Sequence, residues 1–259
     1  MDYVKHNSLA WDNEVKSGNE WTKPVSSEDV EAARQGNWGI VLTPTKIVPR
    51  NWFGNIEGKN ILCLASGGGQ QGPILAAAGA NVTVFDNSIE QLKRDEYVAK
   101  RDGLNIKTIQ GDMRDLSVFD DESFDIIFHP VSNIFVDNII SVWNEASRVL
   151  KKNGRLLSGF SNPIHYIFDY KQLEKGIFNV KHAIPYSELK SLSEEERTEY
   201  IHKKIPFEFG HTLEDQIKGQ IDAGFVIAGF FEDNYGGRSP LDQYINTFMA
   251  TCAIKVNID

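Results

Sequence analysis

A glycine-rich loop and a later aspartate are the strongest chemical signal in the sequence. Gly67-Gly-Gly-Gln-Gln-Gly72 has the spacing G-x-G-x-x-G and lies between a predicted strand and a predicted helix. Glycines let the backbone approach a ligand closely, and the start of a helix favours a negative group. Asp86, at the end of the next predicted strand, can accept hydrogen bonds from both hydroxyls of a ribose. The combination predicts a site for an adenosine-containing ligand, with a glycine-rich surface turn as the alternative.

From Lys59 onward, the residues that must position this loop alternate between strand-like and helix-like segments. Strands are predicted at 60–65, 81–85, 106–110, 124–128 and 155–160, and helices at 73–78, 88–102 and 138–150. The first strand is a continuous apolar run, which is typical of a strand buried on both faces. Repeated βα units of this kind imply a doubly wound, mostly parallel sheet with right-handed crossovers.

The pattern changes near the C-terminal end. A helix is predicted from a cap at Thr212 to Gly224, followed by strands at 225–231 and 246–256 with no helix between them. Two strands joined without a helical crossover should pair antiparallel. We therefore predict an α/β fold: a doubly wound, seven-stranded, mostly parallel sheet with an antiparallel last strand.

We expect one domain over residues 1–259. It would consist of an N-terminal cap segment (1–57), a cofactor-binding core (58–160), a lid insertion (161–210) and a C-terminal helix with an antiparallel strand pair (211–259). A structureless insertion as long as the third segment is unusual in a compact domain, so we expect a helical lid. Ser193-Glu-Glu-Glu196 has the pattern of a helix start within it.

The cap segment is rich in tryptophan. Four of the five tryptophans lie in the first 52 residues, namely Trp11, Trp21, Trp38 and Trp52. Two interpretations stay open for them: they pack a helix against the sheet, or they wall a binding site, as aromatic side chains do in small-molecule pockets.

Three further motifs follow the glycine loop in a fixed order. Gln110-Gly-Asp-Met-Arg-Asp-Leu116 follows the third predicted strand, Ser123-Phe-Asp-Ile-Ile-Phe128 forms the fourth, and Arg148-Val-Leu-Lys-Lys-Asn-Gly154 precedes the fifth. With these motifs the sequence resembles the class I S-adenosylmethionine-dependent methyltransferases, especially those that act on small molecules. The resemblance covers about residues 58–160 motif by motif, and the topology beyond. It implies an enzyme that transfers a methyl group from S-adenosyl-L-methionine to a small molecule by in-line displacement.

The resemblance also implies which residues bind the cofactor. They are Ala65, Ser66, Gly67, Gly68, Gly69, Asp86, Asn87, Gly111, Asp112, Met113, His129 and Pro130. The loop from Ala65 would line the methionine part, Asp86 would hold the ribose, and Asp112 and Met113 would contact the adenine. For Asp112 a role as a turn residue stays open, and for Met113 a role as core filler.

His129 is the candidate catalytic residue. A hydroxyl or ammonium acceptor must lose a proton to a base, whereas a thiol or carboxylate acceptor needs none. His129 follows the fourth predicted strand, where the resemblance places the methyl group. The alternative is an imidazole that only caps the strand end.

The composition limits which kinds of partner and which location we expect for the protein. Lys and Arg total 27 against 36 Asp and Glu, a net charge of −9 without a basic patch, which disfavours nucleic acid. No apolar run reaches the roughly 18 residues of a membrane span. Two cysteines and six histidines lack metal-ligand spacing, so we expect no metal and a reducing, cytoplasmic location. An NAD(P)-dependent oxidoreductase and a non-catalytic binding protein of the same fold remain alternatives, and the oligomeric state is not predicted.

Overall fold

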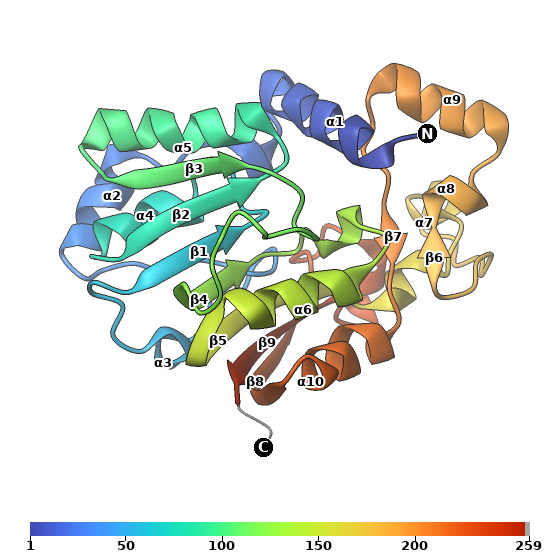
Figure 1. The fold of residues 1–259 in the computed structure, drawn as a ribbon. Helices are drawn as coiled ribbons and strands as arrows, with labels where there is room; N and C mark the ends of the chain where they lie inside the picture. The colour runs from blue at the N-terminus through green and yellow to red at the C-terminus, as the bar shows by residue number, and fades with distance from the viewer. Residues whose placement is uncertain (257–259) are drawn as a thin grey trace.

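The computed structural model describes residues 1–256, which form a seven-stranded sheet with helices on both faces (Figure 1). The strands are β1 (Asn60–Leu64), β2 (Asn81–Asp86), β3 (Ile106–Gln110), β4 (Phe124–His129), β5 (Leu150–Ser161), β8 (Phe225–Asp233) and β9 (Phe248–Lys255). Their order is β3-β2-β1-β4-β5-β9-β8. The first five strands in this order are parallel, and β9 runs antiparallel to both β5 and β8. The predicted sheet is confirmed.

The helices form the two layers that cover the sheet and part of the segment beyond its strand ends. They are α1 (Tyr3–Ser17), α2 (Ser27–Arg34), α3 (Arg50–Phe53), α4 (Gln71–Ala77), α5 (Ile89–Asp102), α6 (Ile139–Val149), α7 (Tyr170–Leu173), α8 (Glu188–Ser191), α9 (Glu194–Lys203) and α10 (Gly219–Asp222). Alternate residues of β1 show why two layers form. Ile61 and Cys63 join a core cluster with α4, α5 and the N-terminal segment, whereas Leu62 and Leu64 join a second cluster with α6.

Local signals set the bounds of most elements. The Ser88 hydroxyl accepts a hydrogen bond from the Gln91 N–H and begins α5, and Gly103, with φ +64°, ends it as predicted. The predicted turn at 151–154 is wrong, because these residues continue β5. The strand accommodates them by a shift of register against β4 and by Asn153 at φ +62°, a conformation that asparagine tolerates.

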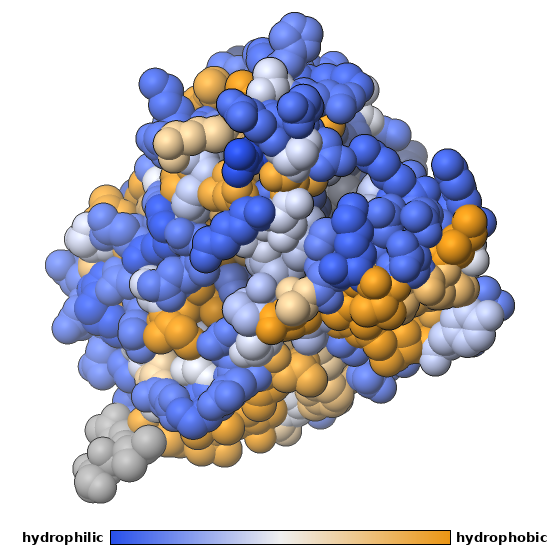
Figure 2. All heavy atoms as spheres, turned by 90° about the vertical axis from the view of Figure 1, so that its right-hand side faces the viewer, coloured by the Kyte–Doolittle hydropathy of each residue, from blue (hydrophilic) through white to orange (hydrophobic). Residues whose placement is uncertain are grey.

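The segment between β5 and α10 folds over the carboxyl ends of the parallel strands (Figure 1). It contains α7, α8 and α9 and a two-stranded ribbon of β6 (Tyr186–Ser187) and β7 (Phe209–Gly210). A capping box of Ser193 and Glu196 begins α9, as the sequence predicts. The outer face of this side carries hydrophilic and hydrophobic areas (Figure 2). The exposed apolar side chains of this segment include Ile177 and Val180. We call residues 161–210 the lid.

Helix α1 connects the core and the lid. The Ser8 hydroxyl donates to the Asn87 carbonyl at 2.7 Å, and the Asn87 amide donates to the Val4 carbonyl at 2.9 Å. On the lid side, the buried amide of Asn7 donates to the Phe207 carbonyl at 2.9 Å and accepts from the Phe207 N–H at 2.8 Å. The helix thus bonds both to the end of β2 and to the lid.

Candidate active site

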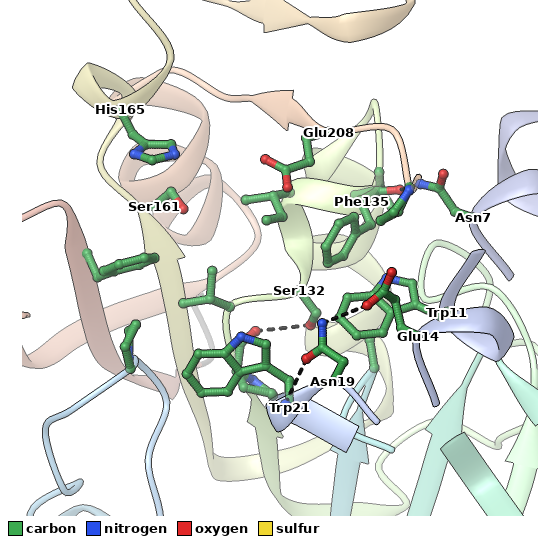
Figure 3. A pocket seen from close by; sticks show the side chains of 18 of the residues that line it. Asn7, Trp11, Glu14, Asn19, Trp21, Ser132, Phe135, Ser161, His165 and Glu208 are labelled. Atoms are coloured by element: carbon green, nitrogen blue, oxygen red, sulfur yellow. Dashed lines mark hydrogen bonds between the residues drawn. The ribbon is translucent and has the colours of Figure 1, made fainter. Parts of the chain in front are cut away.

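A cavity of about 1010 Å³ lies at the carboxyl ends of the parallel strands, between the core and the lid (Figure 3). Ligands of open α/β sheets bind at this edge, where the loops after the strands converge. The volume is at the upper end of the range for small-molecule pockets, roughly 300–1,000 Å³. The cavity therefore has room for a nucleoside-sized ligand together with a second small molecule.

The glycine loop and Asp86 form one unit at the cavity wall. The N–H groups of Gly67 and Ser88 each donate to a different oxygen of the Asp86 carboxylate at 2.9 Å. A Cβ at Gly67 would lie 2.8 Å from the Gln91 Cβ and 3.1 Å from an Asp86 oxygen, so the position requires glycine. Burial raises the pKa of Asp86. Each carboxylate oxygen keeps a further lone pair, which leaves Asp86 able to accept hydroxyl groups.

Eight of the twelve predicted cofactor-binding residues line the cavity. They are Ala65, Ser66, Gly67, Asp86, Asn87, Asp112, Met113 and Pro130. Among residues 1–256, Gly68, Gly69, Gly111 and His129 are not part of this wall. The loop thus reaches the cavity through Ala65, Ser66 and Gly67 and, further along, through Gln70 and Gln71.

The other glycines are required by packing rather than by a ligand. A Cβ at Gly68 would lie 3.0 Å from the Trp21 carbonyl oxygen, and one at Gly69 would lie 3.1 Å from Pro24, because the N-terminal segment covers the loop. A Cβ at Gly111 would lie 2.2 Å from the Phe85 ring.

Asp95 hydrogen-bonds to the glycine loop from α5, and the sequence analysis did not identify it. Its fully buried carboxylate, on α5, accepts the N–H groups of Gly68 and Gly69 at 3.0 and 3.1 Å through one oxygen, while the other oxygen has no partner. Burial raises the pKa of Asp95 to about 8, and the charge of Asp86 adds to this effect. An acid on the apolar face of the predicted helix, one turn after Gln91, is the signal that could have found it.

Asp112 and Met113 border the cavity, and each also contacts other residues of the protein. Arg114 bonds to the Asp112 carboxylate, with an Nη2–Oδ2 distance of 2.6 Å, and also to Asp137 at 2.9 Å. Met113 is buried in the core cluster that contains Phe119. Met113 therefore fills the core, as one interpretation has it, and also borders the cavity, while its contact with adenine stays a prediction.

His129 is placed as a buried imidazole. Its Nδ1 lies 2.9 Å from the Leu64 carbonyl oxygen, its ring packs edge-on against Trp143, and its side chain is fully buried. Burial lowers its pKa to about 4, so the ring is neutral near pH 7. This geometry supports the alternative, in which the ring only caps the strand end. It argues against the catalytic-base hypothesis, because the buried ring is not part of the cavity wall.

Of the four N-terminal tryptophans, two wall the cavity and two pack in the core. Trp11 and Trp21 line the cavity, and Trp11 packs against Phe135 (Figure 3). Trp38 and Trp52 instead pack against phenylalanines of the core cluster that contains α4 and α5.

Two polar residues of the N-terminal segment were also missed. The Asn19 amide donates to the Glu14 carboxylate at 2.7 Å and its oxygen accepts from the Trp21 N–H at 2.9 Å, and all three residues border the cavity (Figure 3). Gln70 ties the same segment to the glycine loop by donating to the Glu20 carbonyl at 3.2 Å. No spacing in the sequence relates Glu14 to Gly67, because only the fold brings them together.

The lid contributes a separate acidic cluster. Glu188 and Glu208 border the cavity together with five tyrosines, which are Tyr166, Tyr170, Tyr186, Tyr200 and Tyr235. The Tyr166 hydroxyl donates to Glu208 at 2.9 Å, and the Glu208 N–H donates to the Glu188 carboxylate at 2.7 Å. Burial and the neighbouring Glu208 raise the pKa of Glu188 to about 8.

Comparisons with known proteins agree with this arrangement. A family model described as a methyltransferase domain matches residues 62–158. The uncharacterized methyltransferase YbaJ of Bacillus subtilis (strain 168) is 56% identical over 253 residues, which cover 98% of each chain. Sterol 24-C-methyltransferase of Pneumocystis carinii (strain B80) is 33% identical over 101 residues, covering 38% of this chain and 26% of that protein.

Solved structures show the same fold. An S-adenosylmethionine dependent methyltransferase from Mesorhizobium loti superposes with a TM-score of 0.60 at 15% identity, covering 80% of this chain and 95% of that chain. A putative one from Listeria monocytogenes gives a TM-score of 0.59 at 14% identity, covering 80% and 96%. Within residues 1–256, no helix combines the length and the apolar character needed to cross a membrane.

Proposed function

Because the chain belongs to the class I S-adenosylmethionine-dependent methyltransferases, we propose that it methylates a small molecule held under the lid, by in-line displacement. The observation that carries the proposal is the single cavity that joins the Gly67–Asp86 unit to the tyrosine-lined compartment of the lid. Family membership implies S-adenosyl-L-methionine as the cofactor, which supplies an activated methyl group when bound. The task of the protein is then to orient an acceptor and exclude water.

The residues at the cavity fit this cofactor. We assign the free lone pairs of Asp86 to the ribose hydroxyls and the side chain of Met113 to one side of the adenine, with Asp112 at the adenine edge. We assign Glu14, held by Asn19 beside the glycine loop, to the ammonium of the methionine part, because a carboxylate at a partly desolvated wall favours a cation.

The size and walls of the cavity support a small acceptor. The lid and α1 enclose the compartment, and the chain has a net charge of −9, which opposes a nucleic-acid substrate. We therefore propose a small-molecule acceptor and no nucleic-acid partner.

Binding measurements test the proposal. S-adenosyl-L-methionine and its demethylated product should raise the melting temperature, whereas NAD and NADP should not. Asp86→Ala should weaken binding of the cofactor by about 1.5–3 kcal/mol, the cost of a lost hydrogen bond to a charged group. Asp115→Ala, at an exposed carboxylate away from the cavity, is the matched control and should leave the dissociation constant unchanged. A shift with NAD alone would contradict the proposed function, and an unchanged constant for Asp86→Ala would remove Asp86 from the site.

A further inference from the structure

The lid holds two acidic side chains next to each other. The ribbon of β6 and β7 brings Glu188 beside Glu208, so that the Glu188 N–H donates to the Glu208 carbonyl at 3.1 Å and the Glu208 N–H donates to the Glu188 carboxylate at 2.7 Å. Both residues border the cavity and are otherwise surrounded by protein. Two carboxylates in one desolvated compartment repel each other, so one of them takes up a proton unless an opposite charge joins the pair.

The protein does not supply that opposite charge. Within residues 1–256, no Lys, Arg or His nitrogen forms an ion pair with either carboxylate, and their side-chain partners are the hydroxyls of Tyr166 and Tyr200. Four cations of the surrounding elements are engaged elsewhere. Lys171 pairs with Glu196, Lys181 pairs with Asp169, Arg197 donates to the Leu189 carbonyl, and Arg238 pairs with Glu20.

Aromatic rings complete the compartment. Tyr166 and Tyr186 stack with their ring centroids 5.4 Å apart, and Tyr235 and Tyr200 border the same space. His165 also lies at this wall (Figure 3). The faces of aromatic rings attract cations, most strongly in a desolvated site. Paired carboxylates and aromatic rings thus meet at one end of the cavity.

We propose that this compartment binds the acceptor through a positively charged amine, so that the substrate class is a cationic alkylamine. The inference rests on the proposed function, because it names the occupant of the acceptor part of the same cavity. The ammonium lies between Glu188 and Glu208 and against the tyrosine rings.

A pair of isosteric probes tests the charge requirement. Choline and 3,3-dimethylbutan-1-ol have nearly the same shape, but only choline carries a positive charge. Titration calorimetry and ligand-observed NMR, with the wild-type protein, should show choline binding at least about tenfold more tightly, the preference expected for a cation over ring faces and carboxylates. Butylamine against butan-1-ol should show the same order. Equal affinity, tighter binding of the alcohols, or no binding of either cation overturns the proposal.

Variants locate the effect at the two acids. Glu188→Gln and Glu208→Gln keep the shape and remove the charge, so each should reduce the preference for choline severalfold. Glu199→Gln, at an exposed lid carboxylate paired with Lys203, is the matched control and should keep the full preference. A preference that survives both substitutions unchanged overturns the assignment to these residues. Melting-temperature shifts with the demethylated cofactor product form a separate arm, so that failure of the proposed function and failure of this inference are distinguished.

Discussion

The substitution Asp95→Asn should change how the stability of the protein depends on pH. The Asp95 carboxylate is fully buried beneath the glycine loop, and burial raises its pKa from 3.8 to about 8. Between these two values the folded protein holds a proton that the unfolded chain has lost. The free energy of unfolding must therefore fall as the pH rises through this window, and the loss is complete above about pH 8.

The structure sets the size of the effect. Asparagine keeps the acceptor oxygen for the N–H groups of Gly68 and Gly69 and cannot ionise. The stability of Asp95→Asn minus that of the wild type should therefore grow with pH by up to about 1.4 kcal/mol per unit, or at most about 4 kcal/mol from pH 5 to pH 8. Above this range the difference should stay constant.

Urea unfolding followed by circular dichroism at half-unit steps from pH 5 to pH 9 measures the difference. Asp102→Asn, on the same helix, is the control whose stability difference should stay constant over this range, because the bond to Arg101 lowers the pKa of Asp102 from 3.8 and the carboxyl is ionised in both states above pH 5. A stability difference for Asp95→Asn that does not vary with pH would refute the reasoning, since it would mean that the buried carboxyl ionises as it does in the unfolded chain.

Three further substitutions test other parts of the structure. Ala65 has φ +47°, which is strained for a residue with a Cβ, so Ala65→Gly should raise the free energy of unfolding by about 0.5–1 kcal/mol in the same urea assay; a loss of stability would contradict this. Asn7→Ala should cost about 2–4 kcal/mol, because both backbone groups of Phe207 lose their bonds to the amide, and limited proteolysis should cut the lid first. Because burial lowers the pKa of His129 from 6.5 to about 4, the wild type should lose stability as the pH falls through this range, and His129→Gln should gain about 3 kcal/mol relative to it. A constant difference for His129→Gln would show a solvent-accessible imidazole.

The core of the fold was predictable because its signals are local. The apolar run predicts β1, the caps at Ser88 and Gly103 predict the ends of α5, and the helix-free connection predicts the antiparallel pairing of β8 and β9. The turn predicted at 151–154 failed because Leu150 and Arg155 on either side both pair with β4, so these residues stay within β5 as a local irregularity with Asn153 in the left-handed conformation.

The candidate site was predictable only in part. The residues at the strand ends, such as Gly67 and Asp86, follow from the order of the motifs, since the carboxyl ends of parallel strands share one edge. Glu14 and Glu208 could not be found in this way. Their positions depend on how α1 and the lid pack, which is a long-range property of the chain. Asp95 has a local signal, as an acid on the apolar face of α5, but only the fold shows that its carboxylate lies beneath Gly68 and Gly69.

Helix α1 carries hydrogen bonds at both ends of the cavity, to Asn87 beside the aspartate that we propose binds the ribose and to Phe207 in the lid. A ligand that orders the Asn87 end also orders the helix that holds the lid. The two halves of the cavity then share a coupling free energy, and thermodynamic linkage makes it reciprocal: whatever factor the first ligand adds to the affinity for the second, the second adds to the first. The fold thereby favours cooperative filling of the cavity, in which each compartment reaches its full affinity only when the other is occupied.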